Sequence, residues 1–310
     1  MSKNHAIGID IGGTNLRAGL ISHKGEVLKK AKESSTGNIL QSVNKVIENL
    51  YTENVAGIGL GIAGLIDKKE NVVFCSPNLR SVEGINFVKA LHKQVAVPVI
   101  MENDANAAAF GERWMGAGRQ FNHFVLLTLG TGIGGGIVYE GKLAGCAAEI
   151  GHMSIDINGK KCICGNNGCL ELYAAANAMK SKIVSSIEKG TQSLMKGLYE
   201  GNFYKITAED IYKSALEGDS LAREVIKEAG RYLGVGLANV INIVGPEAII
   251  LTGGLIGAWN IYVQEAIREA SRRTFKPLFD NVKIIPSLLG DNAGIIGAAG
   301  LVFSASGRLA

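Results

Sequence analysis

The sequence predicts an α/β protein built from two similar domains. Strand-like apolar runs alternate with helical stretches along the 310 residues, a length that suffices for two ordinary domains. A succession of strand, glycine-rich turn, strand, turn and strand also occurs twice, about 115–120 residues apart. Because no linker or low-complexity tract separates the two halves, we expect the domains to share a cleft.

The first half shows a sheet-forming pattern interrupted by helical segments. We expect strands at 6–11, 16–21, 26–29, 55–62 and 97–101, and helices at 39–50 and 105–113. The helix at 39–50 is the clearest, because its apolar residues recur at helical spacing on one stripe.

The second half opens with the same pattern. We expect strands at 123–129, 135–139, 142–144, 248–251 and 282–286, and helices at 221–244, 258–273 and 291–302. The last helix is rich in small residues, so it can pack closely against another element.

Composition and charge exclude several classes of partner. The 32 basic and 28 acidic residues give a net charge of +4, and no Lys/Arg block is present that could grip a nucleic-acid backbone. No uninterrupted apolar run reaches the roughly 18 residues that a membrane helix needs. The first residues show no signal-peptide pattern. We therefore expect a cytoplasmic protein without a nucleic-acid or membrane partner.

Two glycine-rich turns are candidate phosphate loops. Gly12 and Gly13 follow a strand, so main-chain N–H groups there can face an anion, and Thr14 can add a hydroxyl donor. Asp10, at the strand end, can hold a metal ion through water. A tight hairpin with an incidental aspartate explains these residues equally well.

The second turn, 130–135, matches GxGxxG, but it does not fit a dinucleotide-binding site. That motif opens a helix, whereas residues 136–139 continue as a strand, and no GxxxxGK[ST] motif is present. Two glycine hairpins in two similar halves favour a nucleotide phosphate chain clamped between the domains.

A cysteine cluster is the most specific local signal. Cys162, Cys164 and Cys169, with His152 upstream, have the residue types and spacing of a closed, structural tetrahedral zinc site. A redox pair or inert thiols are the alternatives. Zinc would fix the nearby Glu149 and Glu171 in rigid positions, where carboxylates can bind sugar hydroxyls. The remaining cysteines, Cys75 and Cys146, are expected to be buried.

Four segments together resemble the ROK (repressor, open reading frame, kinase) family: DIGGTNLR, ENDANAAA, LGTGIGGGIVYEGKLAGCAAEIGH and CICGNNGCLE. The resemblance covers essentially the whole chain. Within the family, the sequence is most similar to the zinc-containing glucokinases. It implies an actin-like, ribonuclease-H-like ATPase fold, with two α/β domains closing over ATP and sugar. We assign 1–117 and 291–310 to the N-terminal domain, and 118–290 to the C-terminal domain with the zinc loop.

The resemblance also implies roles for individual residues. Asp104 matches the catalytic base, although it could instead cap the helix that follows it. The implied sugar ligands are Gly64, Asn78, Asn103, Asp104, Glu149, His152 and Glu171. The implied nucleotide-binding residues are Asp10, Gly12, Gly13, Thr14, Asn15, Arg17, Gly130, Thr131, Gly132, Gly134, Gly253 and Gly254. The implied zinc ligands are His152, Cys162, Cys164 and Cys169.

These residues predict an ATP- and Mg²⁺-dependent hexose kinase carrying structural Zn²⁺, with glucose as the first candidate substrate. N-acetylmannosamine and N-acetylglucosamine are the alternatives, and the family resemblance suggests a homodimer or higher homo-oligomer. A sugar-sensing transcriptional regulator is less consistent with the sequence, because the phosphate loop begins at Asp10 and leaves no room for a DNA-binding segment before it. A silent sugar-binding module is disfavoured because Asp104 and both glycine loops are intact.

Overall fold

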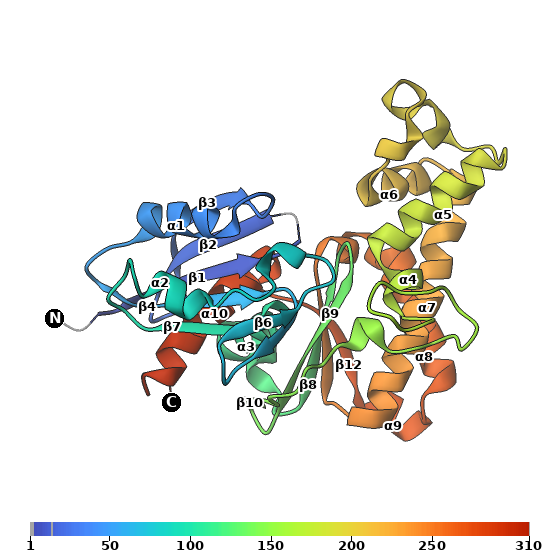
Figure 1. The fold of residues 1–310 in the computed structure, drawn as a ribbon. Coiled ribbons are helices and arrows are strands. Elements are labelled where there is room, and N and C mark those ends of the chain that lie inside the picture. Colours follow the sequence, from blue (N-terminus) through green and yellow to red (C-terminus); the bar gives the residue numbers. More distant parts are fainter. Residues whose placement is uncertain (1–2, 14, 310) are drawn as a thin grey trace. The chain divides into compact units, whose positions relative to one another are not determined.

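The computed structural model describes residues 3–13 and 15–309. The chain forms two compact units (Figure 1). Unit 1 contains Met1–Leu126, Gly136–Ala148 and Ser287–Ala310, and unit 2 contains Leu127–Gly135 and Glu149–Pro286. The two domains expected from the sequence, 1–117 with 291–310 and 118–290, stay a prediction.

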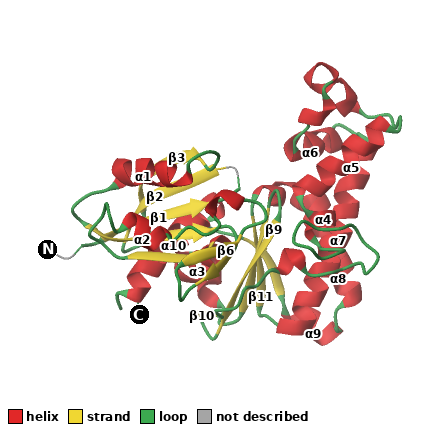
Figure 2. Cartoon of the chain, in the orientation of Figure 1, coloured by secondary structure: helices red, strands yellow, loops and turns green. Residues whose placement is uncertain are grey.

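Unit 1 contains a five-stranded sheet in the order β3-β2-β1-β4-β7 (Figure 2). Its strands are β1 (His5–Ile11), β2 (Asn15–Ser22), β3 (Val27–Ser34), β4 (Val55–Ile62) and β7 (Val99–Asn103). The pairs β1–β2 and β2–β3 are antiparallel, whereas β1–β4 and β4–β7 are parallel. The carboxyl ends of β1, β4 and β7 therefore reach the same edge of the sheet.

The side chains of successive residues of β1 point to opposite faces of this sheet. Ile7, Ile9 and Ile11 are fully buried in the core that includes α1 (Ile39–Leu50) and α2 (Phe87–Leu91). The opposite face packs against α10 (Ala293–Ala305), whose approach requires glycine: a Cβ on Gly8 would lie 1.8 Å from the carbonyl oxygen of Ile295. The small-residue helix expected at 291–302 is thus confirmed as a closely packed element.

Helix α10 also packs on α3 (Asp104–Met115), which follows β7 directly. A Cβ on Gly297 would lie 1.7 Å from the carbonyl oxygen of Ala107. Further elements of unit 1 are η1 (Arg80–Val82), η2 (Ala117–Gln120), η8 (Gly290–Asn292) and a hairpin of β5 (Leu65–Asp67) with β6 (Val72–Cys75). This β5–β6 hairpin is not among the elements expected from the sequence pattern.

The second sheet has the order β10-β9-β8-β11-β12 and repeats the topology of the first. Its strands are β8 (Phe124–Leu129), β9 (Ile133–Tyr139), β10 (Lys142–Leu143), β11 (Ala248–Thr252) and β12 (Lys283–Pro286). In each sheet, the first of three consecutive strands is central, the next two extend the sheet to one edge, and two later strands complete the other side. This agreement confirms the duplicated strand pattern that the sequence predicted.

Helices of unit 2 pack beside one another, with α7 in contact with α4, α5, α6 and α8 (Figure 1). The unit contains η3 (Ile150–His152), α4 (Glu171–Ala174), α5 (Ala176–Glu188), η4 (Leu194–Gly201), η5 (Phe203–Lys205), α6 (Ala208–Leu216), α7 (Ser220–Val244), η6 (Gly254–Ala258), η7 (Trp259–Val263), α8 (Gln264–Arg273) and α9 (Lys276–Asn281). Asp219 caps α7, and Gly245 ends it in the left-handed conformation. Among the described helices, none combines the length and apolar character needed to cross a membrane.

One expected helix is more complex than its sequence pattern. Residues 258–273 were expected to form a single helix, but the segment begins as 3₁₀ turns, continues as one π-helical stretch in η7, and becomes α-helical only from Gln264. The apolar spacing is compatible with all three helix types, so periodicity could not separate them.

Candidate functional site

The end of β7 and the start of α3 bring the predicted catalytic residues together. Asn103 is the N-cap of α3: its Oδ1 accepts the N–H groups of Ala105 at 2.9 Å and Asn106 at 3.0 Å. The Asn103 Nδ2 donates to the carbonyl oxygen of Gly64 at 3.1 Å. The capping role considered for Asp104 therefore belongs to Asn103, and Asp104 is the first residue of the helix.

The carboxyl of Asp104 is more basic than an ordinary aspartate. Burial raises its pKa, against the opposing effect of the N–H of Ala105, which donates to its Oδ1 at 2.9 Å. A carboxylate with a raised pKa accepts a proton more readily. The geometry thus supplies a proton acceptor beside the Gly64–Asn103 contact.

Asp10 lies close enough to Asp104 for their charges to interact. Burial first and the Asp104 carboxylate second raise the pKa of Asp10 to about 7, although Arg17 lowers it. Arg17 also pairs with Asp291, with 3.4 Å between Nη1 and Oδ1. Two neighbouring carboxylates that resist ionising together have the donor chemistry that suits a hard divalent cation such as Mg²⁺.

The first glycine turn lies beside another predicted sugar ligand. A Cβ on Gly13 would lie 3.3 Å from the carbonyl oxygen of Asn78, and the N–H of Gly12 donates to the carbonyl oxygen of Asn15 at 3.1 Å. Thr14, which the sequence analysis included in this loop, lies outside the described residues. Unit 1 therefore gathers Asp10, Gly13 and Asn78 near one edge of its sheet.

Unit 2 gathers a second set of predicted site residues. Glu171 Oε2 accepts the N–H of Ile133 at 2.9 Å, and Gly130 accepts the N–H of Ala176 at 2.9 Å. Gly253 has a φ of +98°, and a Cβ there would lie 2.4 Å from the carbonyl oxygen of Leu129. The second glycine turn, the start of α4 and the end of β11 thus form one neighbourhood.

Glu149 and His152 occupy the two ends of a short 3₁₀ segment in unit 2. Glu149 is the residue before η3, and its carbonyl oxygen accepts the N–H of His152 at 3.0 Å. This turn fixes the backbone spacing between Glu149 and His152.

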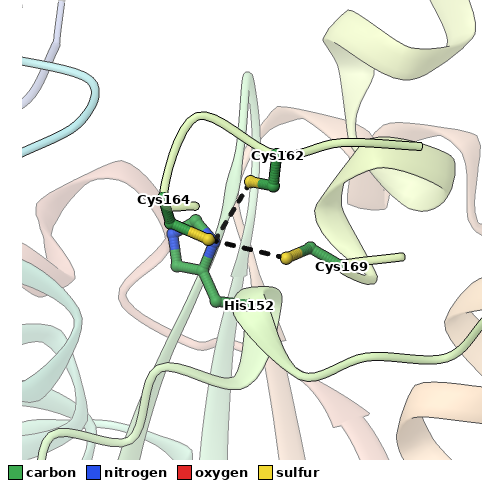
Figure 3. Close-up of side chains that lie close together, drawn as sticks. All are labelled: His152, Cys162, Cys164 and Cys169. Atoms are coloured by element: carbon green, nitrogen blue, oxygen red, sulfur yellow. Dashed lines mark hydrogen bonds between the residues drawn. The ribbon is translucent and has the colours of Figure 1, made fainter. Parts of the chain in front are cut away.

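His152, Cys162, Cys164 and Cys169 form a cluster whose potential ligand atoms all lie within 4.8 Å of one another (Figure 3). Cys162 Sγ is 3.7 Å from His152 Nδ1, and Cys164 Sγ is 3.7 Å from Cys169 Sγ. Zn–S bonds of about 2.3 Å in a tetrahedron give ligand separations of about 3.8 Å, whereas a disulfide requires about 2.05 Å. The cluster therefore fits zinc geometry and contains no disulfide.

The thiol chemistry of this cluster also fits a cation. Burial and the two neighbouring thiols raise the pKa of Cys169 to about 12, so a bound metal is what would allow all three thiols to ionise together. Asn166 supports the loop by donating to the carbonyl oxygen of His152 at 3.1 Å. In contrast, Cys146 is exposed, so the expectation that it is buried was wrong.

Two buried glutamates have structural positions that sequence reasoning missed. Glu102, just before Asn103, pairs with Lys68, and Glu112, with no exposed surface, accepts the Ser287 hydroxyl and the N–H of Leu289 at 3.0 Å. Glu112 therefore fastens the segment before α10 to α3. The sequence carries no clear signal for either residue, because Glu102 adjoins the polar residues Asn103 and Asp104, and Glu112 adjoins Arg113.

The repeated sheet topology, with carboxylates and glycine turns at strand ends, defines an actin-like ATPase fold of two α/β domains. A family model described as "ROK family" matches residues 6–305. The chain belongs to the ROK family.

Named relatives include both enzymes and regulators. The chain is 35% identical to the glucokinase of Thermotoga maritima, over 97% of this chain and 98% of that protein. It is 31% identical to the xylose repressor of Bacillus subtilis, over 96% of this chain and 77% of that protein. The similarity to glucokinases supports the prediction of a sugar kinase.

A solved relative has the same fold. The structure of a ROK family glucokinase from Streptomyces griseus, in complex with glucose and AMPPNP, superposes with a TM-score of 0.85 at 31% identity, covering 96% of this chain and 98% of that one. The ligand roles assigned above to individual residues of this chain stay predictions.

Proposed function

We propose that this protein transfers the γ-phosphoryl group of ATP to a hydroxyl of a hexose, with glucose as the preferred substrate and glucose 6-phosphate as the product. The observation that carries the proposal is the position of Asp104: a half-buried carboxylate of raised pKa at the end of β7, next to Asn103 and Gly64 and close to Asp10. Similarity to glucokinases over nearly the whole chain supports the choice of substrate class.

In this proposal Asp104 is the catalytic base. It accepts the proton of the hexose hydroxyl as the oxygen attacks the terminal phosphorus, and the P–O bond to ADP breaks. In unit 1 we assign hexose binding to Gly64, Asn78 and Asn103. In unit 2 we assign it to Glu149, His152 and Glu171. Orientation by several hydrogen-bonding groups supplies much of the rate enhancement in phosphoryl transfer.

We assign the phosphate chain of ATP to the two glycine turns. In unit 1 the assigned residues are Asp10, Gly12, Gly13, Thr14, Asn15 and Arg17. In unit 2 they are Gly130, Thr131, Gly132 and Gly134, with Gly253 and Gly254 beside the adenosine. Mg²⁺ would be held near Asp10, where it would neutralise phosphate charge. Glycines at these turns leave the backbone N–H groups open to an anion.

We assign Zn²⁺ to His152, Cys162, Cys164 and Cys169 as a structural ion. All four positions of a tetrahedron are then filled by protein, which leaves no site for a reacting water. The ion would fix the loop that carries Glu149 and Glu171. We also propose a homodimer, which sedimentation of the purified protein at several concentrations would test.

The experiment is a panel of hexoses with Mg-ATP, in which ADP release gives kcat/KM for each. Glucose, mannose, N-acetylglucosamine and N-acetylmannosamine form the panel, and glucose is expected to give the highest kcat/KM. Asp104→Asn should retain hexose binding by calorimetry and lose about 10²–10⁴-fold in kcat. An Asp104→Asn variant with full turnover would refute the assigned base. Hexose binding without turnover in the wild type would favour the sugar-responsive regulator instead.

A further inference from the structure

The β5–β6 hairpin of unit 1 is fastened to the residues that precede α3. Asn103 Nδ2 donates to the carbonyl oxygen of Gly64, immediately before β5, at 3.1 Å. The Lys68 ammonium, immediately after β5, donates to Glu102 Oε2 at 2.6 Å. Two successive residues at the end of β7 therefore hold both ends of a three-residue strand.

Glu102 is a buried charge with a complete set of partners. Its side chain is 8% exposed, whereas that of Lys68 is 53% exposed. The other carboxylate oxygen, Oε1, accepts the backbone N–H of Asn103 at 3.0 Å and the Nδ2 of Asn106 at 3.2 Å. Lys68 is the cation that compensates this carboxylate, and the same carboxylate orients the backbone of Asn103.

The two strands of the hairpin are held differently. On the β6 side, Val73 accepts the N–H of Gly84 at 2.9 Å, and Glu70, in the turn, accepts the Asn86 side chain at 2.7 Å. Strand β5 pairs only with β6 within the described sheets, and it has three residues. Among the described residues, the polar contacts that join the ends of β5 to the end of β7 are Gly64–Asn103 and Lys68–Glu102. The residue before Gly64 is tied to β1 instead, because the N–H of Ala63 donates to the carbonyl oxygen of Ile11 at 3.1 Å.

We propose that the Lys68–Glu102 ion pair is a latch that seats β5 against the end of β7, and that Lys68 is a positioning residue for hexose binding. The inference rests on the proposed function, in which Gly64 and Asn103 bind the sugar. When the latch is closed, the Gly64 carbonyl and the Asn103 amide keep one arrangement. When it is open, the hydrogen bond between Gly64 and Asn103 is the one polar contact among the described residues that still joins β5 to the end of β7.

The expected kinetic effect follows from the population of the closed form. A hexose that binds only the closed hairpin has an apparent dissociation constant equal to the intrinsic one divided by the closed fraction. Saturating hexose restores the closed form, so kcat is preserved. A variant that merely damaged the fold would instead lower the active fraction, and therefore kcat, with KM unchanged.

The test replaces Lys68 by Met, which keeps the aliphatic stem and removes the charge. Since one partner of the pair is half exposed, hexose KM should rise about three- to tenfold in Lys68→Met, with kcat within about twofold. KM for ATP should not change. Lys68→Arg, which restores the charge, should recover most of the hexose affinity. The matched control is Lys69→Met, because Lys69 is exposed and its side chain makes no ion pair among the described residues.

A second arm identifies the partner of Lys68. In a Glu102→Gln background, Lys68→Met should have almost no further effect on hexose KM, because the ion pair is already lost. Raising ionic strength should raise KM in the wild type and leave Lys68→Met nearly unchanged. An unchanged hexose KM in Lys68→Met, or a fall in kcat with KM constant, would overturn the proposal.

A third arm does not depend on the activity. Amide hydrogen exchange of the free protein should be faster in the hairpin, residues 65–75, for Lys68→Met than for the wild type or Lys69→Met. If the wild type phosphorylates no hexose but exchange increases as expected, the proposed function fails and the latch stands. If exchange does not change, the latch is refuted whatever the activity.

Discussion

Glu171 Oε2 accepts the backbone N–H of Ile133 at 2.9 Å. This hydrogen bond joins the residue that begins α4, two positions after the last cysteine of the metal cluster, to the second glycine turn. One carboxylate oxygen is thereby committed to the backbone. In the proposed function the same side chain would both position the turn and bind a hydroxyl.

Glu171→Ala and Glu171→Gln should therefore differ in stability. Ile133 is buried, so alanine leaves its N–H without an acceptor and should lower the free energy of unfolding by about 1–3 kcal/mol. Glutamine keeps an oxygen acceptor and should cost about 1 kcal/mol or less. Urea unfolding measures both. Equal losses in the two variants would show that the hydrogen bond to Ile133 contributes little.

Removing one ligand of the metal cluster should release the metal. Cys164→Ser is expected to lower zinc content well below one ion per chain and to lower Tm by roughly 5 °C or more, because bound metal stabilises only the folded loop. Cys146→Ser is the matched control, since Cys146 is also an exposed cysteine but lies outside the cluster. Metal analysis together with thermal unfolding decides the case, and full zinc occupancy in Cys164→Ser would contradict the assigned ligand set.

Periodicity in the sequence was sufficient to predict elements whose burial follows a simple repeat. The helix at 39–50 coincides with α1, and the expected helix at 221–244 differs from α7 by one residue. The rejection of a dinucleotide motif is likewise confirmed, because residues 133–139 form strand β9. In both helices one face is apolar and the other polar, so the pattern reports the helix directly.

Elements without such a repeat could not be predicted in this way. Strand β5 has three residues and alternates too briefly to be distinguished from a loop, so the hairpin and its Lys68–Glu102 pair were missed. The capping of α3 by Asn103 rather than Asp104 is another example, because both are strong N-cap residues and only the backbone decides which one precedes the helix. The metal cluster was predictable because ligand type and spacing alone constrain it.

The pKa of Asp10 predicts a specific pH dependence of stability. Burial and Asp104 raise it from 3.8 to about 7, so between these pH values the folded state holds a proton that the unfolded state has lost. Stability should fall as pH rises through that window, and Asp10→Asn should remove the fall. Between pH 4 and pH 8, the free energy of unfolding of the variant should rise by on the order of 2 kcal/mol relative to that of the wild type. Partial contact of Asp10 with solvent screens the charge and keeps the effect below its full size.

The measurement is urea unfolding of both proteins at several pH values, with chelator and without nucleotide. Addition of Mg²⁺ at pH 8 should reduce the difference, because a cation favours the ionised carboxylate. A difference between the two proteins that does not change with pH would mean that Asp10 titrates normally in the folded state.

The contact between α10 and α3 should tolerate no added methyl group. In Gly297→Ala the new Cβ would meet the Ala107 carbonyl oxygen, so the helices must separate, at a cost of about 2–4 kcal/mol in the free energy of unfolding. Ser304→Ala lies on the exposed side of α10 and should change stability by about 0.5 kcal/mol or less. Chemical unfolding compares them, and equal stabilities would show that α10 can shift without cost.

The raised pKa of Asp104 predicts where activity is lost in acid. Only the ionised carboxylate accepts a proton, so kcat/KM for the hexose should fall as pH drops through a pKa above the usual aspartate value of 3.8. Asp10 can produce a similar decline, and Mg²⁺ separates the two. Protons and Mg²⁺ compete at Asp10, so its contribution should move to lower pH as Mg²⁺ is raised, whereas the contribution of Asp104 should stay. An acidic limb that moves entirely with Mg²⁺ would assign the decline to Asp10 and leave Asp104 ionised throughout.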